Sequence, residues 1–281
     1  MTWEDALSLA GSKVDKARLW EALIPSMGIF ALVRNLRNFG RAGASDEVAA
    51  TVAAKLADPE LIARSRMFPF RFWAAYKHTD SLRWAHALEY SLANVPALGG
   101  RTLILVDRSP SMFPGYRYST PNKSDIPLAE QAAVFGAALA LRAVDPTLVE
   151  FGGGNRAIPV AKGGSVLKLI EKFRQIDGTD IPRAVRDHYA GHDRVVIVTD
   201  EQTRPGWLPS NMFHHGGSRE TRIDDLVPRE VPVYMWNMAG YKHGAAPSGS
   251  SNRHTLGGLS DSAVRLIPLL EAGRDASWPW L

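Results

Sequence analysis

The chain has 281 residues, of which 45% are hydrophobic and 22% are charged, so its composition is that of a globular protein and excludes a disordered chain. The absence of cysteine excludes disulfide scaffolds, thiolate zinc sites and cysteine nucleophiles. The net charge of +4 is spread evenly, with 12 basic and 10 acidic residues up to residue 98 and no basic tail. Without a signal-peptide pattern or an apolar run of about 20 residues, the protein is expected to be cytoplasmic and to have no membrane partner.

The first part of the chain, up to residue 98, has helical periodicity. An apolar stripe from Leu19 to Leu36 predicts helical structure, and Pro25 must either begin a helix or kink this stripe. Further helices are expected at residues 45–56, from residue 58, around residues 71–76 and at residues 80–92. Short helices joined by brief turns predict an α-solenoid fragment, although no internal sequence repeat is visible.

The hydrophobic pattern changes after Val95–Gly100, which marks the predicted start of a second domain at residue 99. Continuous apolar runs at 102–106, 194–199 and 231–236 are typical of strands that are buried on both faces. Other strands are expected at 147–151 and 157–160, with helices at 128–144, 165–175, 180–190 and 261–272. This alternation predicts an α/β domain over residues 99–281, with a doubly wound, mostly parallel sheet whose ligands bind at the carboxyl ends of the strands.

Oxygen-bearing side chains follow two of the predicted strands. The first strand is followed by Asp107, Ser109 and Ser111, Thr179 lies in a later turn, and Asp200 directly follows the strand at 194–199. Such an all-oxygen set suits a hard divalent cation, Mg²⁺ or else Mn²⁺ or Ca²⁺. The set resembles the metal-ion-dependent adhesion site (MIDAS) of von Willebrand factor A domains. The alternative interpretation is that the hydroxyls and Asp200 cap the helices that follow.

The sequence argues against an enzyme. A phosphatase of the haloacid dehalogenase type needs a second carboxylate two residues after Asp107, where Ser109 stands. Nucleophile-elbow, Walker, dinucleotide-binding and H-E-x-x-H motifs are also absent. Gly152–Gly154 lacks the Lys-Ser/Thr of a phosphate cradle and predicts a sharp turn. The adjacent His214 and His215 are expected to be solvent-exposed.

Two segments of the first domain carry a more specific resemblance. Trp20–Met27 (WEALIPSM) followed by Leu32–Asn38 (LVRNLRN) resembles the TROVE module of the Ro ribonucleoprotein autoantigen family. In that family HEAT-like helical repeats precede a von Willebrand factor A domain, and the members bind small noncoding Y RNAs and the single-stranded ends of misfolded RNAs. The family's ring of repeats needs more helical sequence than residues 1–98 provide. The chain is therefore expected to correspond to the carboxyl-terminal portion of a Ro-like protein.

Basic residues of the first domain form a candidate RNA surface. Three arginines recur at helical spacing, and four more cations alternate with aromatic residues; the set is Arg34, Arg37, Arg41, Arg64, Arg66, Arg71 and Lys77. For the interleaved aromatics, burial in the interhelical core is favoured over stacking on bases. The arginines fit phosphate binding and an ordinary solvated face about equally well.

These patterns lead to three function hypotheses. The preferred one is a noncatalytic RNA-binding component of a Ro-like ribonucleoprotein that carries a divalent-metal site, with no DNA partner. The alternative is a metal-dependent protein-interaction module, in which an acidic residue of the partner completes the coordination of the metal held by Asp107 and its neighbours. A hydrolase that uses the same cluster to activate water ranks last because a positioned base is missing.

Overall fold

The computed structural model describes residues 2–11, 14–79, 82–116, 126–200, 222–239, 252–258 and 263–273. The chain divides into two compact units, Met1–Asn94 and Val95–Leu281. The boundary between them lies four residues before the one that the sequence predicted, after residue 98. Within the described residues, no helix combines the length and apolar character that crossing a bilayer requires.

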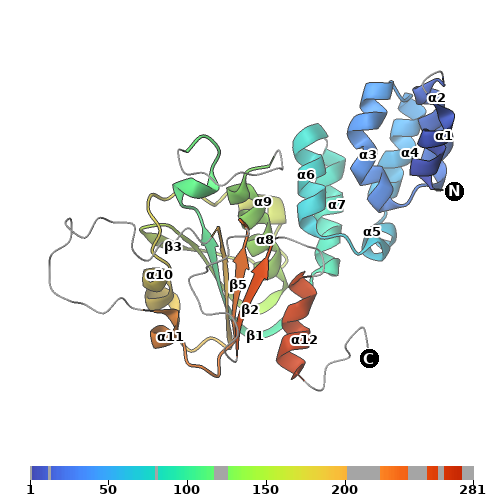
Figure 1. Cartoon of the computed structure of the whole chain (residues 1–281). Helices are drawn as coiled ribbons and strands as arrows, with labels where there is room; N and C mark the ends of the chain where they lie inside the picture. The colour runs from blue at the N-terminus through green and yellow to red at the C-terminus, as the bar shows by residue number, and fades with distance from the viewer. Residues whose placement is uncertain are drawn as a thin grey trace. The chain divides into compact units, whose positions relative to one another are not determined.

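The amino-terminal unit is built of short helices (Figure 1). They are α1 (Trp3–Ala10), α2 (Lys16–Leu23), α3 (Ile29–Ala42), α4 (Asp46–Leu56), α5 (Pro59–Ser65), α6 (Pro69–Thr79) and α7 (Leu82–Tyr90), with 3-10 turns η1 (Ile24–Ser26) and η2 (Ser91–Asn94). The predicted apolar stripe is therefore divided between α2 and α3, because Pro25 lies in η1 and interrupts the helix. Helix α1 was not predicted. Thr2 and Asp5 form its capping box.

A lysine of α4 forms hydrogen bonds with the segment between α2 and α3. The Nζ atom of Lys55, in the last turn of α4, donates hydrogen bonds to the carbonyl oxygens of Ile24, Pro25 and Met27 at 3.2, 2.6 and 3.0 Å. The carbonyl of Ile24 also accepts the N–H of Met27, whereas carbonyls at a helix end otherwise lack a partner within the helix, so the lysine adds donors where the helix is interrupted. Lys55 thereby fixes α4 against the start of α3.

The second unit contains a single described sheet with the strand order β3-β2-β1-β4-β5-β6. The strands are β1 (Leu98–Asp107), β2 (Ala143–Phe151), β3 (Asn155–Ile158), β4 (Arg194–Thr199), β5 (Val233–Asn237) and β6 (Arg253–Gly257). All neighbouring strands are parallel except β2 and β3. The predicted α/β fold with a mostly parallel sheet is confirmed, whereas the edge strand β6 was not predicted.

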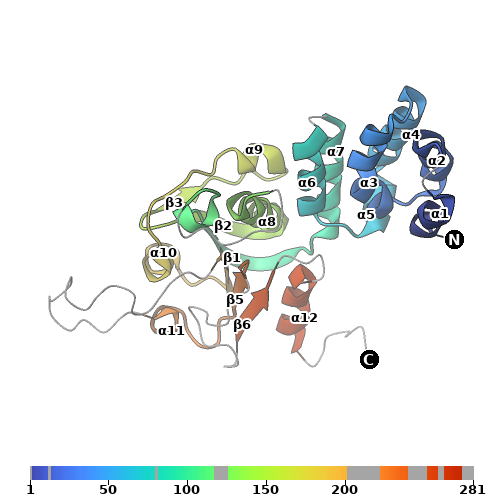
Figure 2. The same cartoon turned by 45° about the horizontal axis from the view of Figure 1, so that its top comes forward.

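Helices cover both faces of this sheet (Figure 2). The helices described in this unit are α8 (Leu128–Arg142), α9 (Val166–Ile170), α10 (Ile181–His188), α11 (Ile223–Leu226) and α12 (Leu266–Ala272), with 3-10 turns η3 (Pro110–Met112) and η4 (Ala263–Arg265). Helices α10 and α11 pack on the face that carries Leu103, Leu105 and Ile197. On the opposite face, a Cβ at Gly136 of α8 would clash with Val106 of β1, so the helix can approach the sheet this closely only with glycine there. The predicted helix at 165–175 is shorter, since α9 ends at Ile170.

Candidate metal centre

The central strands bring the predicted metal ligands to one edge of the sheet. Strand β1 ends at Asp107 and its parallel neighbour β4 ends at Thr199, with Val106 opposite Val198 in the register. Asp107 and Asp200 therefore leave adjacent strands at the same, carboxyl, edge. This is the edge where ligands bind in open α/β sheets.

Asp107 is held by hydrogen bonds at both carboxylate oxygens. The backbone N–H of Ser109 donates to its Oδ1 at 2.8 Å, and the hydroxyl of Thr199 donates to its Oδ2 at 2.6 Å. The hydroxyls of Ser109 and Ser111 lie 3.1 Å apart, because the 3-10 turn η3 brings the second serine back beside the first. Asp107, Ser109 and Ser111 are buried, as is Asp200. The structure therefore brings three of the predicted ligands into direct contact.

The capping alternative does not fit Ser109. Its side chain makes no capping hydrogen bond to η3 and instead contacts the hydroxyl of Ser111. The capping role considered for Asp200 involves residues 201–221, which lie outside the described residues, as do His214 and His215. For Ser109, the contacts thus do not support the role of a helix cap.

The electrostatics of the cluster favour a bound cation. Burial, and after it the charge of Asp200, raises the pKa of Asp107 to about 6, while the hydrogen bonds from Ser109 and Thr199 act in the opposite direction. Loss of hydration and repulsion by Asp200 make the charged form of Asp107 costly. A divalent cation between the two carboxylates would offset both costs and restore ionisation.

Thr179 is carried by a loop that packs against the Asp107 loop. The N–H of Ile176 donates to the carbonyl of Arg108 at 2.9 Å, and the N–H of Gly153 donates to the carbonyl of Asp177 at 2.6 Å. A Cβ at Gly152 would lie 2.5 Å from the carbonyl oxygen of Ile176, and one at Gly153 would lie 2.8 Å from that of Asp177. The glycine run therefore forms the predicted turn and also allows the Thr179 loop to approach.

The donor set fits a hard divalent cation. Carboxylates and hydroxyls are the ligands that Mg²⁺ and Ca²⁺ take in proteins, with water in the remaining positions. Among the described residues there is no group of three or more His, Asp or Glu side chains arranged to hold a metal. Any metal at this edge would therefore depend on hydroxyl oxygens as well as on Asp107 and Asp200. The sequence analysis did not include Thr199 in the cluster, although its position directly before Asp200 could have indicated it.

The predicted RNA-binding residues lie in the amino-terminal unit, on α3 and α5–α6. Arg34, Arg37 and Arg41 are exposed on α3, and Arg64, Arg66 and Lys77 are exposed on or beside α5 and α6, whereas Arg71 is half-buried. Some of these cations have local partners: Arg34 lies 3.6 Å from Glu4, and Arg64 lies 3.4 Å from Glu60. Among the interleaved aromatics, Phe68, Phe72 and Trp73 are buried, so the core interpretation is correct for them.

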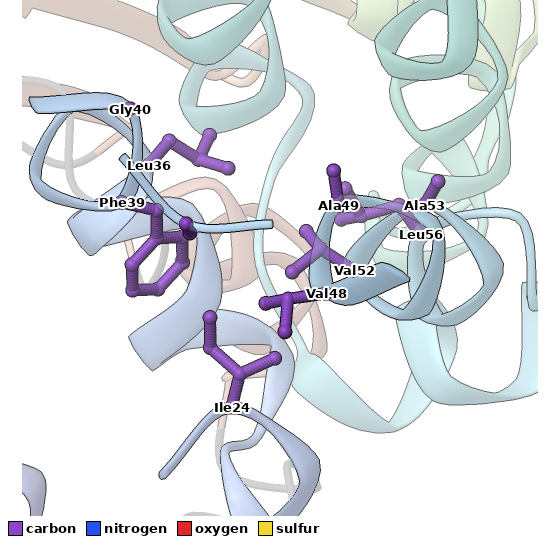
Figure 3. Close-up of a pocket in the computed structure, with 10 residues that line it drawn as sticks. Ile24, Leu36, Phe39, Gly40, Val48, Ala49, Val52, Ala53 and Leu56 are labelled. Carbon is purple, nitrogen blue, oxygen red and sulfur yellow. The ribbon is translucent and has the colours of Figure 1, made fainter. Parts of the chain in front are cut away.

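The same unit contains an apolar cavity of about 270 Å³ between α3 and α4. Figure 3 shows Leu36 and Phe39 of α3 opposite Val48 and Val52 of α4, with Ile24 of η1 at one end. Every residue that lines it is apolar, so the cavity has no polar side chain with which to orient a ligand. It is therefore not a candidate nucleic-acid site.

Comparisons with known proteins agree with the sequence-based resemblance. Residues 1–94 match the family model described as the TROVE domain. The chain is similar to the crystal structure of the Deinococcus radiodurans RO (RSR) protein, with 17% sequence identity and a TM-score of 0.73. The match covers 95% of this chain and 57% of that protein, so the chain spans little more than half the length of its solved relative. No curated protein matches the chain significantly. The resemblance to bacterial-type Ro proteins is thus confirmed, by the TROVE family model over residues 1–94 and by the fold over nearly the whole chain.

Proposed function

We propose that the chain is a noncatalytic RNA-binding component of a Ro-like ribonucleoprotein, with small noncoding or misfolded RNA as its ligand. The observation that carries this proposal is the exposed side of α3. Within a segment that matches the TROVE domain, this helix contains Arg34, Arg37 and Arg41 and no acidic residue. Phosphates are attracted to such a face whatever the RNA sequence, because each contact releases condensed counterions.

The chemistry of the second unit supports a noncatalytic role. The hydroxyl of Ser109 occupies the place where a phosphatase of the dehalogenase type has its second carboxylate. Both oxygens of the Asp107 carboxylate accept hydrogen bonds from the surrounding loop and strand. The group is thus held as a ligand rather than presented as a nucleophile.

Charge reversal on α3 tests the RNA proposal. Fluorescence anisotropy would measure binding of a structured RNA with a single-stranded 3′ end to the wild-type chain, to Arg37→Glu and to Lys168→Glu. Lys168 is an exposed cation on α9, so its variant changes the net charge equally. We expect affinity to fall on the order of tenfold for Arg37→Glu and to change little for Lys168→Glu. Equal effects of the two variants would reduce the interaction to net charge and refute the α3 surface.

A second candidate function rests on the oxygen cluster. We propose that Asp107, Ser109, Ser111, Thr179 and Asp200 hold Mg²⁺, or else Mn²⁺ or Ca²⁺, and that an acidic side chain of a protein partner completes the coordination. Bound there, the cation would supply positive charge for an incoming carboxylate. Calorimetric titration with Mn²⁺ should give saturable binding by the wild type and none by Asp107→Ala. Equal binding by both would place the metal elsewhere.

A further inference from the structure

Phe30, in the first turn of α3, has an unusually exposed aromatic ring. It is 47% exposed, whereas its neighbours Ile29 and Leu32 are buried and provide the core side of the helix. Isolated apolar side chains on a surface are common, so exposure alone assigns nothing to Phe30. Its position on the helix and its neighbours give the ring a specific setting.

Helical periodicity places Phe30 at one end of the arginine stripe. Relative to Phe30, Arg34, Arg37 and Arg41 follow at four, seven and eleven residues, which confines all four side chains to an arc of about 60° on the helix. The stripe extends about 16 Å along the helix axis. A strand of RNA that follows it would therefore pass from the cations directly onto the ring.

A cation from a neighbouring helix lies over the same ring. Helix α6 packs against α3, and the guanidinium carbon of its Arg71 is 5.3 Å from the ring centroid of Phe30. Arginine and phenylalanine at this distance form a cation–π pair. Because the ring remains half-exposed, its accessible part can still contact a flat ligand. The guanidinium itself offers a second planar surface.

The charges around the ring favour a polyanion over a protein partner. Helices α3 and α6 together contain four arginines and Lys77 and no acidic residue, whereas α4 begins with Asp46 and Glu47. A protein interface would be expected to provide a larger apolar core than a single ring bordered by arginines. Aromatic rings beside cationic grooves are the recurrent means by which proteins bind unpaired bases.

We infer that Phe30, together with Arg71, is a stacking platform for one unpaired base of a single-stranded RNA whose phosphates lie along Arg37 and Arg41. This inference rests on the proposed RNA-binding function and adds to it the side chains that contact an unpaired base. Stacking tolerates any base, so the platform adds affinity for single strands without reading their sequence.

The test uses the full chain and two RNAs of equal length, a single-stranded one that contains 2-aminopurine and a duplex. Phe30→Leu removes the ring but keeps an apolar side chain, and Tyr90→Leu removes another exposed ring of the same unit as a matched control. Thermal unfolding of each variant verifies folding. We expect Phe30→Leu to weaken single-strand binding roughly 5- to 100-fold and to abolish the quenching of 2-aminopurine fluorescence. Its duplex binding and the salt dependence of its binding should stay unchanged. Tyr90→Leu should change none of these properties.

The outcomes separate the inference from the function on which it rests. Unchanged single-strand affinity and unchanged quenching in Phe30→Leu would overturn the stacking platform while leaving RNA binding by the arginines intact. An equal loss of duplex and single-strand binding would overturn it as well, because a duplex has no unpaired base to stack. If the wild type binds neither RNA, the proposed function and the platform both fail.

Discussion

Replacement of Asp107 by asparagine should stabilise the metal-free protein at neutral pH. The carboxylate is fully buried near Asp200, and its pKa is raised from 3.8 to about 6, mainly by burial and then by the charge of Asp200. Each pKa unit corresponds to about 1.4 kcal/mol, so the ionised group lowers the free energy of unfolding at pH 7.5 by about 3 kcal/mol. The asparagine side chain has nearly the same shape as the carboxylate and carries no charge.

The hydrogen bonds of Asp107 allow this exchange. The Oδ1 atom of an asparagine can accept the hydrogen bond from the N–H of Ser109. Its Nδ2 can donate to the hydroxyl oxygen of Thr199, although in the wild type this hydroxyl is the donor. The hydroxyl must rotate and lose its charged acceptor, which costs about 1 kcal/mol. We therefore expect Asp107→Asn to unfold at higher denaturant concentration than the wild type in EDTA, by a net gain of about 2 kcal/mol.

The raised pKa of Asp107 also determines how stability depends on pH and on metal. Between pH 3.8 and about 6 the folded state retains a proton on Asp107 that the unfolded state has lost, so wild-type stability should fall as pH rises through this window relative to Asp107→Asn. Above pH 6, Mg²⁺ should stabilise the wild type and leave the variant unchanged. Urea titrations in EDTA and in Mg²⁺ measure both effects. If Asp107→Asn is less stable than the wild type in EDTA, the carboxylate stabilises the fold as a structural cap and does not destabilise it.

Three further predictions concern packing, pH and an ion pair. Gly136→Ala should cost about 1–3 kcal/mol because its methyl group clashes with Val106, and stabilisation in urea titrations would contradict this packing. Burial lowers the pKa of His192, whose Nδ1 accepts a backbone N–H. The neutral imidazole therefore makes its full contribution to the free energy of unfolding above pH 6.5, and this contribution falls as the pH drops below 6.5. Identical pH profiles of Tm for wild type and His192→Gln would refute this. Arg194 is buried and donates two hydrogen bonds to Glu271, whose side chain is 25% exposed. Arg194→Ala should therefore cost about 1–3 kcal/mol in urea titrations, and an unchanged free energy of unfolding would contradict this.

The central strands could be predicted because burial on both faces leaves a continuous apolar run in the sequence. The runs at Leu103–Val106 and Val195–Val198 are fully buried and were placed correctly. Strand β6 was missed because Arg253–Gly257 is a short edge strand with alternating burial and no such run. Its pairing with β5 depends on a distant segment, which local periodicity does not report.

The candidate site could be predicted as a set of residue types but not as a geometry. Asp107, Ser109, Ser111 and Asp200 follow strand ends, and this position is visible in the sequence. The approach of the Thr179 loop was not visible, since it depends on contacts of Gly152 and Gly153 with residues more than 20 positions away. A Gly-Gly-Gly turn has the same local pattern whether or not another loop packs on it.

The most direct test of RNA binding is anisotropy of the wild-type chain with a structured RNA that has a single-stranded 3′ end, at about 50 and about 200 mM salt. We predict submicromolar affinity at low salt. The logarithm of the binding constant should fall with the logarithm of the salt concentration with a slope of several, as expected for phosphates bound along Arg34, Arg37 and Arg41. Absence of binding at both salt concentrations would contradict the proposed function and leave the oxygen cluster at Asp107 as the candidate functional site of this chain.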